Sequence, residues 1–194
     1  MKTSAFDYEL PKELIAQTPL ARRDQSRMLV CDRESGAFRH AFFIDFPNLL
    51  SPGDVLVTNR SRVIPARLLG TRKDGDISCE VLLLRRLDRD TWEALVRPGR
   101  RLKAGALVLF GGGMLQCVVG EPTAFGGRVV RFSYEGAFEA LLDTLGQMPL
   151  PPYIHQRLED RGRYQTVYAK EEGSAAAPTA GLHFTQEVLQ RVRA

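Results

Sequence analysis

The feature that most constrains this chain is a series of short strand-like runs in its central part. Six runs of mainly apolar and β-branched residues recur there, separated by glycine-rich breaks, at residues 63–69, 77–84, 91–97, 106–110, 114–119 and 128–134. Short strands at such intervals favour a small β-barrel or sandwich. Gly111-Gly112-Gly113 falls between two of the runs, so we expect a hairpin turn there rather than a phosphate-binding loop.

A helix is expected directly after the last strand. Phe138, Leu141, Leu142 and Leu145 recur at helical spacing, and Gly146 is a natural C-cap. The proline-rich residues 148–154 that follow predict a stiff, extended connector.

The rest of the chain has weaker local patterns. They predict a short helix at 10–15, a hairpin of strands 27–32 and 37–44, a strand at 55–57, a strand at 164–169 and a helix capped by Thr185.

Composition indicates a soluble globular protein of one or two domains. Of the 194 residues 44% are hydrophobic, with no apolar run of membrane-spanning length and no signal-peptide core, so a cytoplasmic protein that does not enter membranes is expected. Cys31, Cys79 and Cys117 are odd in number, far apart and in strand-like runs. They predict buried thiols, with neither a disulfide framework nor a metal site.

Positive charge is concentrated in one internal segment. Residues 59–103 hold twelve Lys/Arg against six Asp/Glu, whereas the remainder holds fifteen against seventeen. Such a distribution is typical of a surface that binds polyanions. The alternative is a solvated face whose arginines reflect genomic base composition.

Three polar segments are candidates for function. In the first, Asn59 and Ser61 follow the apolar run 55–57, where ligand-binding groups are frequent, and Arg62 and Arg67 could hold phosphate or carboxylate. An Asx/Ser turn with surface arginines explains the same spacing.

In the second segment, small residues around Thr179 and Gly181 permit close approach of a flat ligand, and His183 is a candidate general base. A buried histidine with satisfied hydrogen bonds is the alternative. The third segment is a basic turn that could clamp phosphates or simply be solvated, with cations at Arg97, Arg100, Arg101 and Lys103.

Taken in order, several motifs resemble the S-adenosylmethionine:tRNA ribosyltransferase-isomerase family from end to end of the chain. They are Phe6-Asp7-Tyr8-Glu9-Leu10-Pro11, Asn59-x-Ser61-Arg62-Val63-Ile64-Pro65-Ala66-Arg67, Pro149-Leu150-Pro151-Pro152-Tyr153-Ile154, Tyr164-Gln165-Thr166-Val167-Tyr168-Ala169 and Ala176-Ala177-Pro178-Thr179-Ala180-Gly181-Leu182-His183-Phe184. Family members run well beyond Ala194, so a C-terminally truncated member is expected.

The resemblance implies an enzyme that transfers and isomerises the ribosyl part of S-adenosylmethionine onto 7-aminomethyl-7-deazaguanine at the wobble position of tRNA with a GUN anticodon. Epoxyqueuosine, adenine and methionine are the implied products. S-adenosylmethionine would be a co-substrate, with no metal or further cofactor, and the protein a monomer.

The resemblance also suggests roles for the candidate residues. His183 would be the catalytic base with Thr179 beside it, and Gly181 would let the ligand approach. Ribose or carboxylate oxygens and the anticodon base would be bound by Asn59, Ser61, Arg62, Arg67, Tyr153, Gln165 and Tyr168, and RNA phosphates by Arg97, Arg100, Arg101 and Lys103.

The implied fold is an α/β (mixed α+β) domain interrupted by an inserted small β-barrel. We expect residues 1–60 and 148–194 to belong to the α/β domain and residues 61–147 to form the insert. Two other hypotheses remain open: a non-catalytic tRNA-binding fragment, and an enzyme that uses the same pocket on a small molecule.

Overall fold

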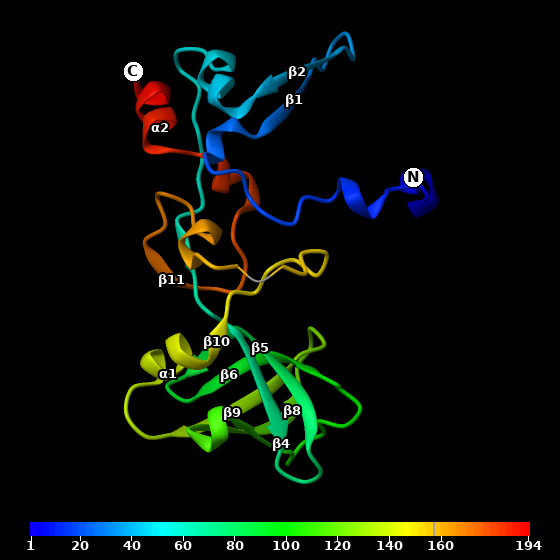
Figure 1. Cartoon of the computed structure of the whole chain (residues 1–194), viewed down its shortest axis with the longest axis vertical. Helices are drawn as coiled ribbons and strands as arrows, with labels where there is room; N and C mark the ends of the chain where they lie inside the picture. The colour runs from blue at the N-terminus through cyan, green and yellow to red at the C-terminus, as the bar shows by residue number, and fades with distance from the viewer. Residues whose placement is uncertain (157) are drawn as a thin grey trace.

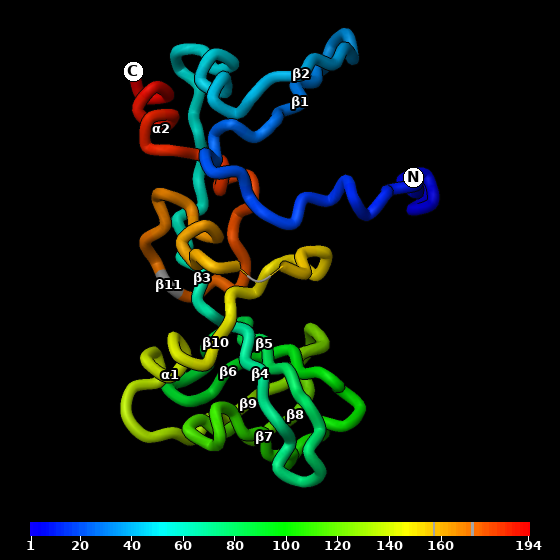
Figure 2. Tube along the Cα trace, viewed as in Figure 1, coloured from blue at the N-terminus to red at the C-terminus, as the bar shows by residue number. Residues whose placement is uncertain are grey.

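A computed structural model describes residues 1–156 and 158–194, and only the backbone of Glu172. A compact barrel occupies one end of the long axis, and a more open region, built from both ends of the chain, occupies the other (Figures 1 and 2). The predicted mixed α/β architecture interrupted by a small barrel is confirmed.

Six antiparallel strands form the barrel. In chain order they are β4 (Arg67–Arg72), β5 (Ile77–Asp88), β6 (Thr91–Arg97), β7 (Leu107–Phe110), β8 (Leu115–Pro122) and β9 (Arg128–Tyr134). They pair in the order β4-β5-β6-β9-β8-β7, and β4 also pairs with β7, which closes the sheet on itself. The glycine run η5 (Gly111–Gly113) turns β7 into β8, as predicted.

Period-two alternation supplies the barrel interior. On β5 the side chains of Cys79, Val81 and Leu83 are buried while their neighbours are not. At the closing seam, a Cβ at Gly70 would overlap the Leu109 carbonyl oxygen and the Phe110 ring, so only glycine lets β4 approach β7.

Helix α1 (Phe138–Leu145) packs against the barrel, as its periodicity predicts. The Phe138 ring lies 5.8 Å from Trp92 and 5.1 Å from Phe132, measured between ring centroids. Gly146 does end the helix, but in an extended conformation (φ −79°) rather than a left-handed one. Glycine is required there because a Cβ would overlap the Pro65 carbonyl oxygen. Strand β10 (Gly146–Gln147) then pairs with β4.

The predicted strand 63–69 is two strands. Residues 64–66 break it, and β3 (Ser61–Val63) leaves the barrel to pair in parallel with β11 (Glu171–Ser174). This pairing joins the beginning of the expected insert to a segment more than a hundred residues further along the chain.

Besides the β3–β11 pair, the described residues of the open region form a hairpin, an α-helix and several 3₁₀ turns. The predicted hairpin is confirmed as β1 (Arg27–Cys31) and β2 (Phe38–Phe42), and Thr185 caps α2 (Gln186–Arg193) by accepting a 3.2 Å hydrogen bond from the Val188 N–H. The 3₁₀ turns are η1 (Thr3–Phe6), η2 (Lys12–Leu14), η3 (Arg23–Gln25), η4 (Phe43–Leu49), η6 (Arg161–Tyr164) and η7 (Thr179–His183).

Two expected strands are wrong. Residues 55–57 pair with nothing in the described chain, and the side chains of Val55 and Val57 are 86% and 88% exposed. Residues 164–169 form the end of η6 and a turn. Both runs have the right residue types, but a strand also needs a neighbour to pair with, which local sequence does not reveal. No helix in the described residues is long and apolar enough to span a membrane.

Candidate functional site

Long-range contacts bring the second candidate segment close to parts of the chain far away in sequence. The Gln165 side chain accepts a 2.9 Å hydrogen bond from the Val63 N–H and donates one of 2.5 Å to the Val63 carbonyl, just beside the β3–β11 pairing. From the N-terminal region, the Arg23 guanidinium donates to the Gln165 carbonyl at 2.8 Å. Three segments therefore meet at Gln165, and η3 of the N-terminal region also contacts η7.

Gly181, at the centre of η7, is buried against two side chains. A Cβ there would overlap the Tyr168 hydroxyl and lie 3.0 Å from the Thr166 methyl group. The sequence predicted that a ligand would approach Gly181 closely. In the structure, the side chains of Tyr168 and Thr166 occupy that space instead. Thr179, at the start of η7, is exposed.

His183 ends η7 in a half-buried position. Its ring meets Phe43 edge-on, with 5.4 Å between ring centroids, and its Nδ1 is buried without a hydrogen-bond partner among the described residues. The same holds for Oγ1 of Thr166, which packs beside Gly181. Buried polar atoms without partners are uncommon and frequently mark functional positions.

Burial lowers the pKa of His183, and the positive charge of Arg23 lowers it further. The imidazole is therefore neutral near neutral pH, with one nitrogen able to accept a proton. This is the state that a general base requires.

The first candidate segment is locally an Asx turn. The Asn59 side-chain oxygen accepts hydrogen bonds from the Ser61 backbone N–H, at 2.8 Å, and from the Ser61 hydroxyl. Arg62 and Gln165 line a hollow of about 260 Å³ at the junction with the barrel. Arg67 is not among the residues lining it, and its guanidinium donates to Glu80 at 2.9 and 2.6 Å on the barrel wall.

A groove of about 650 Å³ runs beside these segments. Its mainly apolar wall includes Leu150, Tyr153, Tyr164 and Leu182, the chain neighbour of His183. The Gln17 side chain fixes one edge by donating to the Tyr153 carbonyl at 3.0 Å and accepting from the His155 N–H at 2.9 Å. Of the three residues expected to hold a base, Tyr153 lines this groove, whereas Gln165 and Tyr168 do not.

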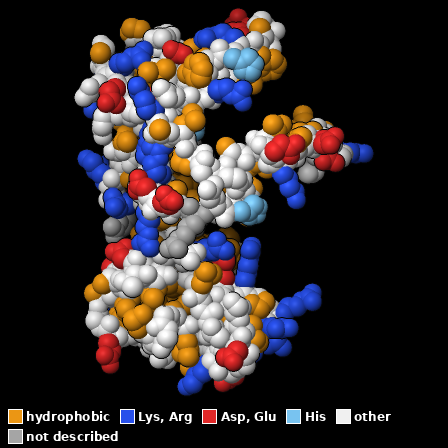
Figure 3. All heavy atoms as spheres, in the orientation of Figure 1, with side chains coloured by type: hydrophobic (Ala, Val, Ile, Leu, Met, Phe, Trp, Pro, Cys, Tyr) orange, Lys and Arg blue, Asp and Glu red, His pale blue; other side chains and the backbone are white. Residues whose placement is uncertain are grey.

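The basic turn lies on the barrel, away from η7. Arg97 ends β6, and Arg100, Arg101 and Lys103 line a separate hollow of about 530 Å³. Lys and Arg side chains project from one edge of the barrel in Figure 3. A fourth lining cation, Arg72, comes from β4 and was not singled out in the sequence.

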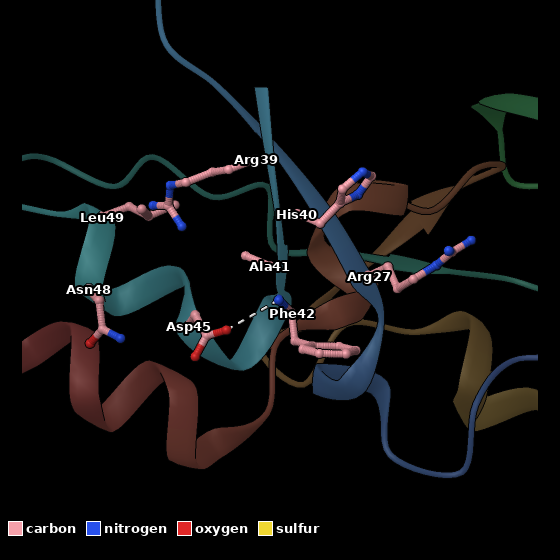
Figure 4. Close-up of a pocket in the computed structure, with 8 residues that line it drawn as sticks. All are labelled: Arg27, Arg39, His40, Ala41, Phe42, Asp45, Asn48 and Leu49. Atoms are coloured by element: carbon pink, nitrogen blue, oxygen red, sulfur yellow. Dashed lines mark hydrogen bonds between the residues drawn. The ribbon is translucent and has the colours of Figure 1, made fainter. Parts of the chain in front are cut away.

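One further hollow, of about 530 Å³, lies at the hairpin. Arg39 points toward Leu49 on one side of β2, while His40 and Arg27 lie on the other side (Figure 4). Asp45 accepts a 3.2 Å hydrogen bond from the Phe42 N–H, which closes the turn into η4. Because its charged groups diverge, this hollow has no convergent set of ligands.

Sequence patterns missed Arg23, Thr166 and Arg72. Arg23 and Arg72 each stand in a run of ordinary surface-like charge, and Thr166 is part of a run that predicts a strand. Their importance comes from long-range contacts that no local pattern signals.

The fold and site define a mixed α/β protein with an inserted six-stranded barrel. A family model described as "Queuosine biosynthesis protein" matches residues 3–194, and the chain belongs to that family. The family predicted from the sequence motifs is confirmed.

Two curated relatives carry the name S-adenosylmethionine:tRNA ribosyltransferase-isomerase. That from Symbiobacterium thermophilum is 60% identical and that from Heliobacterium modesticaldum 55% identical, each aligned over 100% of this chain and 57% of its own length. The chain thus spans little more than half the length of these relatives. A crystal structure of S-adenosylmethionine tRNA ribosyltransferase from Thermotoga maritima is 34% identical, with a TM-score of 0.41, over 97% of this chain and 53% of that one.

Proposed function

We propose that this chain carries part of the active site of a tRNA ribosyltransferase-isomerase in queuosine biosynthesis. Its substrates would be S-adenosylmethionine and a tRNA with a GUN anticodon that bears 7-aminomethyl-7-deazaguanine at the wobble position. Its products would be epoxyqueuosine-tRNA, adenine and methionine. The family and the names of the relatives support this proposal.

One structural observation carries the catalytic part of the proposal. His183 combines a depressed pKa with a buried nitrogen that has no partner in the described chain, and it lies against the Phe43 ring and near the charge of Arg23. Most buried side-chain polar atoms in proteins are hydrogen-bonded, so an unpaired ring nitrogen is available to a ligand. His183 is instead suited to take a proton from a bound substrate.

The chemistry of a sulfonium substrate gives this base a task. The positive sulfur acidifies the ribose 5′ carbon, so His183 would remove a proton there and allow adenine to leave. The amine of the deazaguanine would then attack the sugar, and rearrangement would expel methionine. The unpartnered Thr166 hydroxyl could donate to an oxygen that gains negative charge.

The surrounding residues would bind the two substrates. Arg62, beside Gln165, would hold the methionine carboxylate, and Ser61 with Asn59 would hold ribose oxygens. The apolar groove with Tyr153 would receive a planar base, as single-stranded RNA readers do with aromatic side chains. Thr179, which is exposed, would position the ligand at η7, and Gly181 would act indirectly by making room for the Tyr168 hydroxyl. The protein would work as a monomer in the cytoplasm.

The second candidate function is tRNA binding without catalysis. This function is favoured because the chain aligns with only 57% of the length of the relatives. Groups needed for turnover can lie in the other 43%, which has no counterpart here.

A single-turnover assay tests both candidate functions, catalysis and RNA binding without catalysis. The chain is mixed with S-adenosylmethionine and an anticodon stem-loop bearing 7-aminomethyl-7-deazaguanine, free adenine is quantified, and the RNA is weighed by mass spectrometry. Adenine release with a matching mass gain supports the enzyme. RNA binding without either product supports the binding function, and the absence of both contradicts the proposal.

Variants of two histidines assign the base. His183→Gln should slow adenine release by about 10²- to 10⁴-fold, the usual contribution of a general base. His40→Gln, at an exposed position on β2, is the matched control and should keep the wild-type rate. Equal rates for wild type and His183→Gln would remove His183 from the mechanism.

A further inference from the structure

Some cations of the barrel are neutralised by carboxylates, and others gather around one hollow. Arg67, Arg85 and Arg86 form ion pairs with Glu80, Glu93 and Glu139. In contrast, the hollow at the β6–β7 turn is lined by cations that no carboxylate of the described residues pairs with, although Asp74 also lines it. These cations, here called the basic cluster, are Arg72, Arg100, Arg101 and Lys103.

The turn that carries the basic cluster is rigid. Leu102 is fully buried in the barrel core and anchors the turn between Arg101 and Lys103. The backbone N–H groups of Arg101 and Leu102 donate to the Pro98 carbonyl at 3.0 and 3.2 Å, and the Gly105 N–H donates to the Val119 carbonyl at 2.8 Å. Because the backbone is already ordered, binding a ligand here costs little backbone conformational entropy.

Arg72 connects the strand wall to this turn. Its guanidinium donates to the Arg101 carbonyl at 3.1 Å, and its Nε is buried with no partner among the described residues. Arg72 therefore both orients the turn and adds positive charge beneath the exposed side chains of Arg100 and Arg101.

The basic cluster is far from the candidate site beside η7. Arg67 is at the end of β4 that adjoins β10 and the junction, and Arg72 is at the other end. The five residue-to-residue steps from Arg67 to Arg72, at about 3.3 Å each, separate these ends by roughly 17 Å. A single small ligand cannot occupy both places, whereas an RNA can.

We propose that the basic cluster binds backbone phosphates of the RNA substrate, at a distance from the reacting base. Arg100, Arg101 and Lys103 donate to phosphate oxygens, and Arg72 is a positioning residue. The ligand is a phosphodiester backbone rather than a free nucleotide, because the remaining lining residues, Asp74, Ala104, Gly105 and Ala106, include no aromatic ring on which a base could stack. The inference rests on the proposed function, since it takes tRNA as the substrate.

The test measures binding of a fluorescein-labelled tRNA transcript to the 194-residue chain by anisotropy, between 50 and 200 mM salt. The double variant Arg100→Gln/Arg101→Gln should bind on the order of tenfold more weakly at low salt, and the slope of log K against log salt should fall by about 1 to 2. Circular dichroism checks that the variant folds, which is expected because both side chains are exposed.

The matched control removes two other cations from the same barrel. Arg89 and Arg131 are exposed and lie where β6 begins, at the opposite end of that strand from the basic turn. Arg89→Gln/Arg131→Gln should change the affinity less than twofold. Equal weakening by both double variants, or no binding by the wild type, would overturn the proposed site.

The outcomes separate this inference from the proposed function. Suppose that the wild-type chain releases adenine in the single-turnover assay while Arg100→Gln/Arg101→Gln binds tRNA normally. This result overturns the phosphate site but still supports the proposed enzymatic function. Weakened binding in the variant, together with a wild type that is inactive, supports the phosphate site and counts against catalysis by this chain.

Discussion

The barrel and the open region are stabilised in different ways. The barrel contains one continuous core of buried residues contributed by all six strands and α1. The open region has two small clusters, one around Val63, Met148 and Tyr164 and the other around Phe184, Val188 and Leu189. Many large apolar side chains of its first 57 residues are exposed, including Phe6, Leu14, Phe38 and Val57.

The total surface reflects this difference. The chain exposes 13580 Å², whereas a compact monomer of 21.7 kDa exposes roughly 9,200 Å². The barrel should therefore set the global stability, and the open region, where the candidate catalytic residues lie, should unfold locally at lower cost.

The strongest test of this difference is a cavity in the barrel. Phe110 is 1% exposed, and Phe110→Ala should lower the free energy of unfolding by about 3–5 kcal/mol. The single tryptophan, Trp92, is buried in the barrel, so its fluorescence in a urea titration reports barrel unfolding alone. Phe184→Ala, in the open region, should leave that transition unchanged. If both variants shift it equally, the two regions unfold as one unit.

A smaller effect is expected where the two regions join. Gly146→Ala would push a Cβ into the Pro65 carbonyl oxygen, and the shift needed to relieve that overlap should cost about 1–3 kcal/mol in the same Trp92-detected titration. Gly99→Ala is the control, because the nearest atom to its added Cβ is the Val96 carbonyl oxygen at 3.6 Å. An unaffected Gly146→Ala variant would show that the junction is loose.

A local effect is expected beside the candidate site. Gln165→Ala removes both side-chain hydrogen bonds to Val63 and should lower the protection of the Val63 amide in hydrogen exchange by about 1–3 kcal/mol. The Trp92 transition should not move. Gln190→Ala, at an exposed position on α2, should alter neither. Loss of barrel stability in Gln165→Ala would contradict the independence of the two regions.

The smallest effect concerns titration of His183. Because its pKa is lowered in the folded chain, the unfolded chain binds more protons over the interval between the two values. The contribution of His183 to stability is complete above the unfolded pKa and is lost as pH falls through the folded pKa. Arg23→Gln should raise the His183 pKa measured by NMR, and Arg33→Gln, on the exposed hairpin turn, should not.

The sequence by itself determined the elements whose signals are local. The strand-like runs and their glycine-rich breaks are enough to predict β5 through β9, and the spacing from Phe138 to Leu145 is enough to predict α1. The motif order was also sufficient to identify the family. The strands and the helix depend on residues close together in the chain, so the local sequence pattern is enough to predict them.

Tertiary structure alone decided which of the candidate residues meet. It separated Arg67 from Asn59 and Ser61 by pairing it with Glu80, and it assigned Gln165 to the Val63 backbone. It also brought Arg23 and Thr166 toward His183, and Arg72 beneath Arg101. Apart from Arg67 with Glu80, which pair across the β4–β5 hairpin, these contacts join residues far apart in sequence. Local sequence propensity does not predict such pairs, because they form only after the strands have closed into the barrel and the two ends of the chain have packed beside it.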